Sequence, residues 1–197
     1  MLSGQAIAIS GVLLALLGWR AAQADGAGQR LWGLVAAGAL VVAVAQMVGL
    51  ALLAWSVDAS SASMLARLAA TQFVWAMLAR VVAALVVVVV ALARRREPRE
   101  RRWSPLLLAG VATLVVSGVW TSHGMARLGD RGVVLALSAL HQLAASVWIG
   151  GLAHLVVTAF HPQVSPAAAT AILRRFSVLA LRRPSTSSPS APRRPRS

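Results

Sequence analysis

The stretch that decides the fold is Leu31 to Val57, LWGLVAAGALVVAVAQMVGLALLAWSV, a run of 27 residues without one charged side chain. At 1.5 Å per residue, a helix of this length rises about 40 Å, which exceeds the roughly 30 Å hydrocarbon thickness of a bilayer. An uncharged run this long is typical of a membrane-spanning helix. We therefore expect the segment to cross a membrane.

Four other stretches share this character, although the one from Leu68 to Ala93 carries a single charge, that of Arg80. They run from Met1 to Trp19, Leu68 to Ala93, Trp103 to Ser122 and Gly132 to Phe160. A lone strand in lipid would leave its backbone groups unpaired, so helix is favoured even for the valine-rich part. The expected fold is an all-α, polytopic transmembrane bundle in residues 1–181, with spanning helices near residues 2–19, 31–57, 70–93, 103–122 and 132–160.

The composition excludes several function classes. The 19 basic residues are all arginine and stand against 5 acidic ones, for a net charge of +14. They punctuate long uncharged runs and do not gather on a folded polar face, which argues against nucleic-acid binding. The chain has no cysteine, which excludes disulfides and thiolate metal ligands. No stretch resembles a nucleotide-binding loop, and no enzymatic activity is expected.

Orientation follows from the arginine counts of the successive loops, which alternate as 2, 1, 6, 2 and 4 along the chain. Arginine-rich loops stay in the cytoplasm, so the N-terminus is expected outside. The first apolar segment lacks a basic region before it, which favours a retained helix, although Ala21 to Ala24 is an alternative cleavage site. The expected location is the inner (plasma) membrane of a bacterium, and the lipid bilayer is the first partner.

The composition changes after Leu181. Residues 182–197 hold five Arg, four Pro, five Ser, one Thr and one Ala, a mixture that cannot bury a core or a membrane face. We expect a disordered tail. The preceding apolar run from Phe176 to Leu181 is far too short to cross a bilayer. A frameshift or a truncated gene model would explain both features, and the chain would then be the N-terminal portion of a longer transporter.

Within the expected spans, His141 is the residue that calls most for explanation. It lies nine residues beyond Gly132, which places it about 14 Å into the membrane. A neutral histidine bonded to a neighbouring helix is one interpretation, and a metal, haem or proton site is the other. Trp148 follows seven residues later and returns to the same face, which we expect to point into the bundle. His154 lies about 140° around the helix from His141, so the two cannot share a compact site.

Two further positions carry candidate functional groups. His123 and Met125 stand two residues apart at the outer end of the fourth helix, and their imidazole and thioether suit Cu(I), although an ordinary interfacial loop could contain both. Arg80 lies about 9 Å inside the third helix. It could reach the outer head groups, or it could pair with a polar group in the bundle interior, for which Gln46 is one candidate.

The segment from Leu140 to Leu152, LHQLAASVWIGGL, resembles the copper-resistance D (CopD) family of bacterial inner-membrane proteins. Members share an L-H-x-L-A-A-x-x-W-x-G-G-L signature, and this chain matches each of its fixed positions. The resemblance implies a protein that moves copper across the inner membrane with a periplasmic CopC-type partner. It also implies that His123 and His141 are metal residues, with Trp148 as part of the signature.

The expected function is therefore copper transport and copper resistance, with capture at His123 and Met125 and transfer to His141. The two histidines differ in depth by about 14 Å, so a relay is needed. One alternative is a b-type haem electron carrier, which needs two histidines at matching depth on different helices. Another is an incomplete membrane fragment without transport of its own.

Overall fold

The computed structural model describes residues 2–16, 27–56, 62–96, 102–121, 130–159 and 170. Throughout these residues the regular structure is helical, which confirms the all-α prediction. The elements are α1 (Leu2–Leu16), α2 (Ala27–Ser56), α3 (Ala62–Ala69), α4 (Gln72–Arg96), α5 (Ser104–Trp120), α6 (Arg131–Ala145), the π-helical turn η3 (Ser146–Gly150) and α7 (Gly151–Ala159). The predicted tail at residues 182–197 and the alternative cleavage site lie outside the described residues.

Three helical stretches among the described residues are long and apolar enough to cross a membrane. They are Gly28–Ser56, Gln72–Arg96 and Gly132–Val157. The other two expected spans correspond to the shorter apolar helices α1 and α5, of 15 and 17 residues. Those lengths rise about 22 and 25 Å, less than the hydrocarbon thickness of a typical bilayer.

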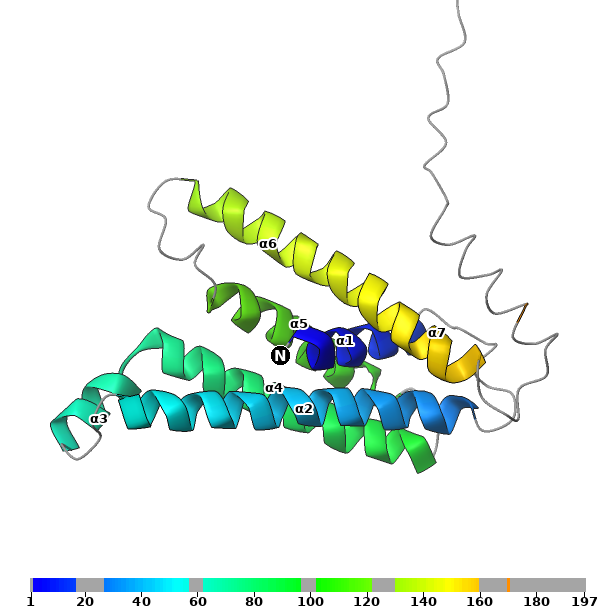
Figure 1. Ribbon diagram of the computed structural model, residues 1–197, viewed down its shortest axis with the longest axis horizontal. Helices are drawn as coiled ribbons and strands as arrows, with labels where there is room; N and C mark the ends of the chain where they lie inside the picture. The colour runs from blue at the N-terminus through cyan, green and yellow to red at the C-terminus, as the bar shows by residue number, and fades with distance from the viewer. Residues whose placement is uncertain are drawn as a thin grey trace, which may run out of the picture.

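The bundle is organised around the long antiparallel pair α2 and α4, which lie side by side (Figure 1). Helices α1 and α5 pack onto this pair, and the continuous α6–η3–α7 helix runs along the outside, against α1 and α5. Small residues at the contacts, such as Ala43, Ala83 and Ala84, let α2 and α4 approach closely, and Leu114 of α5 completes this part of the core.

Helix α1 lies against α2 through a pair of glycines. A Cβ atom added to Gly38 would come within 2.8 Å of the Gly4 carbonyl oxygen, and one added to Gly4 would come within 3.0 Å of the Gly38 carbonyl oxygen. Side chains at either position would force the helices apart. The close contact buries Ile9 and Val12 of α1 completely.

Arg94 ties three helices together at the arginine-rich end of α4. Its guanidinium carbon lies 4.9 Å from the centre of the Trp32 ring of α2. The same guanidinium donates a hydrogen bond of 3.3 Å to Ser104 Oγ at the start of α5. Both Arg94 and Trp32 are buried, so the cation–π contact is largely shielded from solvent. This contact places the start of α2 and the end of α4 at the same end of the bundle.

Two local features depart from the prediction. The sequence analysis placed a loop between the second and third spans, whereas residues Ala62–Ala69 form helix α3. Its Ala, Met, Leu and Arg residues have high helix propensity, which outweighs the single Ser63. The expected helix at residues 132–160 is continuous from Arg131 to Ala159 but contains the π-helical turn η3, which ends at Gly150, the first of two consecutive glycines.

Candidate functional site

The most unusual group in the bundle is the guanidinium of Arg80, on the third turn of α4. The residue is only 7% exposed, although its helix is one of the three candidate spans. Its Nη2 donates a hydrogen bond to Gln5 Oε1 of α1, and Gln5 is 1% exposed. Of the two alternatives left by the sequence, the structure supports pairing inside the bundle. The partner is not one that the sequence analysis named.

Further amides gather near this guanidinium. A Cβ atom added to Gly118 of α5 would lie 2.7 Å from Arg80 Nη1 and 2.6 Å from Gln142 Nε2 of α6. The two nitrogen atoms therefore converge at the point where α5 lacks a side chain. Gln46 of α2 is also buried and lines the same space, so one charge and three amides from α1, α2, α4 and α6 lie near one another.

A cavity of about 740 Å³ opens beside these groups. Its polar lining comes from Gln46, Arg80 and Gln142, together with Thr121 and Ser56. Most of the remaining wall is apolar and belongs to α2 and α4. The apolar lining residues are Leu52, Leu53, Phe73 and Met77. We refer to this space as the Arg80 cavity.

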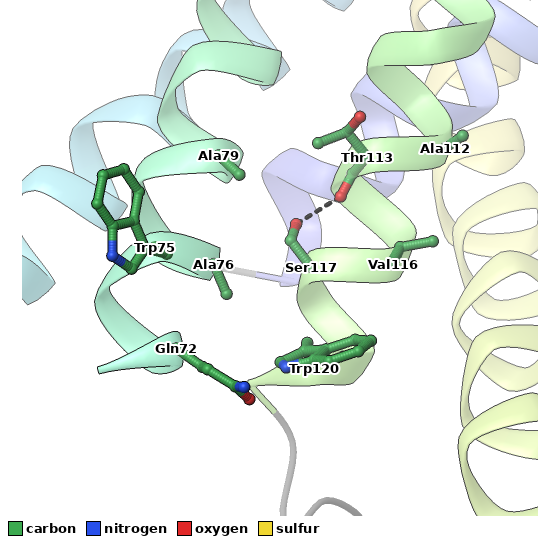
Figure 2. Close-up of a pocket in the computed structure, with 9 residues that line it drawn as sticks. All are labelled: Gln72, Trp75, Ala76, Ala79, Ala112, Thr113, Val116, Ser117 and Trp120. Atoms are coloured by element: carbon green, nitrogen blue, oxygen red, sulfur yellow. Dashed lines mark hydrogen bonds between the residues drawn. The ribbon is translucent and has the colours of Figure 1, made fainter. Parts of the chain in front are cut away.

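A second cavity, of about 600 Å³, lies between α4 and α5 and differs in character (Figure 2). Trp75 and Trp120 flank it, and both are exposed at the surface of the bundle. The Ser117 hydroxyl lines it but donates a 2.5 Å hydrogen bond to the Thr113 carbonyl oxygen of its own helix. The wall is therefore almost entirely apolar, and it offers no charged group to a ligand.

The CopD-like signature lies on the outer helix, where it contacts α1. A methyl group at Gly150 would collide with the Ala6 carbonyl oxygen and Ser10 Oγ, so the absence of a side chain at Gly150 is needed for close packing. One turn later His154 is fully buried, and its Nε2 donates a 3.0 Å hydrogen bond to the Ile7 carbonyl oxygen. The absence of a side chain at Gly11 makes room for this imidazole.

His141 and Trp148 were expected to face the bundle interior, and this orientation is wrong for the described chain. Both are exposed, Trp148 with 56% of its surface accessible. Their helix packs on α1 through the opposite face, which carries Ser146, Gly150 and His154. The relation between them holds, because His141 and Trp148 share one face and His154 lies on another.

The remaining predicted metal residues, His123 and Met125, lie outside the described residues. In the part of the chain that the structure describes, no three His, Cys, Asp or Glu side chains come together as a metal-binding group. Sequence reasoning missed Gln5 and Gln142 as neighbours of Arg80. It also assigned no packing role to His154.

The three long apolar helices mark this chain as an all-helical membrane protein, with a buried charge beside a cavity in its bundle. No family model, curated protein or solved structure matches the chain.

Proposed function

We propose that the chain is a copper-handling protein of the bacterial inner membrane that takes part in copper transport and resistance. The observation that carries the proposal is His141, which lies in the middle of the apolar span Gly132–Val157 within the CopD-like signature. Ionisable side chains inside a span are costly and mark functional positions by default. A neutral imidazole is also a good ligand for copper.

The proposed topology has five spans with the N-terminus outside. The contact between Arg94 and Trp32 supports it, because the arginine-rich first and third connections then lie at the same end of the bundle. Cysteine replacements at Arg96 and Asp130, both exposed, can be labelled on the naturally cysteine-free background. We expect labelling from opposite sides of the membrane. Labelling of both from one side would show that α5 does not cross.

In this proposal, copper reaches His141 from His123 and Met125 after delivery by a periplasmic CopC-type partner. The His141 face of α6 is open in the described chain, so transfer through it requires a further protein helix against that face. The Arg80 cavity is a poor route for a bare copper ion, because its guanidinium is permanently positive and repels cations.

The test is copper accumulation by cells that produce wild type, His141→Ala or Leu140→Ala at matched expression. Leu140 is the control, because it is exposed on the same helix and cannot bind metal. We expect loss of copper-dependent accumulation in His141→Ala alone. Equal accumulation by all three proteins would remove the transport role. A Soret band in the purified protein would instead establish the haem alternative.

A further inference from the structure

We propose that the Arg80 cavity binds the anionic head group of an amphiphile, with the apolar tail lying along α2 and α4. The head group is a carboxylate or a phosphate, and its source is a free fatty acid or an anionic phospholipid. The inference does not depend on copper, because it concerns different side chains and a different face of the bundle.

The first argument is charge. Arginine stays protonated under all physiological conditions, and a buried charge without a counter-ion is costly. Among the described residues the one acidic side chain is Asp130, which is exposed at the start of α6, before its first full turn. The hydrogen bond that Arg80 makes is to the neutral Gln5 amide. No carboxylate of the described residues offsets this charge, and an anionic ligand would supply one.

The second argument is a set of buried N–H groups near Arg80 that have no hydrogen-bond acceptor in the described part of the chain. Arg80 Nε and Gln5 Nε2 are both buried and have no hydrogen-bond partner among the described residues. Arg80 Nη1 and Gln142 Nε2 converge on Gly118. Gln142 Oε1 is also buried without a partner among the described residues, so one surplus acceptor lies beside the surplus N–H groups. Buried polar groups in proteins are normally satisfied, and the N–H groups outnumber this acceptor, which indicates a ligand rich in acceptors. Carboxylate and phosphate oxygens meet this need, and they match the guanidinium geometry.

The third argument is the apolar part of the wall. A volume of about 740 Å³ lies in the range of cavities that hold a molecule of some size, well above what a small inorganic anion fills. Leu52 and Phe73 line it and are 64% and 45% exposed at the surface of the bundle. In a membrane this surface faces lipid, so an amphiphile could enter sideways from the bilayer.

The experiment measures binding of a fluorescent fatty acid, cis-parinaric acid, to the full chain in nanodiscs of zwitterionic phosphatidylcholine. The methyl ester of cis-parinaric acid, which carries no charge, is the control ligand. Loss of a hydrogen-bonded ion pair predicts roughly tenfold to hundredfold weaker binding for the ester and for Arg80→Gln. Arg95→Gln is the control variant, because Arg95 is exposed on the same helix. It should bind as wild type does.

Two further measurements complete the experiment. One identifies the source of the ligand, and the other keeps the test valid if Arg80→Gln fails to fold. Phosphatidylglycerol added to the nanodiscs should displace the probe from wild type if the natural ligand is a phospholipid, and should leave it bound if the ligand is a fatty acid. Leu53→Trp fills the apolar wall without touching the charge and should also weaken binding. Equal affinity for acid and ester overturns the proposal. So does unchanged binding in Leu53→Trp, or competition by inorganic phosphate alone.

Discussion

Replacement of Gly150 by alanine tests the contact that holds the outer helix on α1. The added methyl group would meet the Ala6 carbonyl oxygen and Ser10 Oγ. A backbone oxygen cannot rotate away, so the helices must separate. Overpacking lowers the free energy of unfolding by about 1–3 kcal/mol, and a clash with a backbone atom lies near the upper end of this range. Alanine gains back about 1 kcal/mol of helix propensity. We therefore expect a net loss of about 2 kcal/mol in the free energy of unfolding.

Gly132→Ala is the matched control, because a Cβ atom at Gly132 would meet nothing within 4 Å on the same continuous helix. It should be neutral or stabilising by up to about 1 kcal/mol. Unfolding by sodium dodecyl sulfate in mixed micelles, followed by circular dichroism, compares the two. A cysteine in place of Ser10, which is buried against Gly150, should also react faster in Gly150→Ala than in wild type. If Gly150→Ala is as stable as Gly132→Ala, the docking contact is incorrect.

Two further predictions concern buried side chains with exposed counterparts. His154→Leu removes the hydrogen bond to α1 and should lower the free energy of unfolding by about 1 kcal/mol in the same assay. His141→Leu, at an exposed position, should leave it unchanged. The reverse order would contradict the orientation of the outer helix. Trp32→Ala removes a core ring and its cation–π contact and should lower the free energy of unfolding by about 3–5 kcal/mol. Trp55→Ala, at a position 88% exposed, should change it little. Similar losses in the two variants would refute the packing of Trp32.

The sequence predicted the helices because uncharged length is a strong signal, and the expected second span at residues 31–57 overlaps α2 almost completely. The prediction that the His141 face of the last span is buried is wrong. That helix is apolar nearly all round, so periodicity does not distinguish the face of His141 from the face of His154. The choice depends on Gly11 of α1, where the absence of a side chain leaves room for the His154 imidazole.

The surroundings of Arg80 show a similar limit. The sequence indicates that a charge in a span needs a partner, and it offers Gln46 as one candidate. The partner is Gln5, 75 residues earlier in the chain, on a helix whose position against α4 follows only from packing. Gln142 likewise reaches the site because Gly118 leaves space on α5. The local sequence pattern does not show that these two amide side chains, from distant parts of the chain, meet at Arg80.

The hydrogen bond between Ile7 and His154 joins residues 147 positions apart. At a synthesis rate of about 5–20 residues per second, roughly 7 to 30 seconds separate their appearance. Helix α1 thus waits for the α6–η3–α7 helix while α2, α4 and α5 are inserted. During that interval its glycine-lined surface is open to any other helix in the membrane. Correct assembly of this bundle is therefore a competition between the α6–η3–α7 helix and those other helices for the surface of α1.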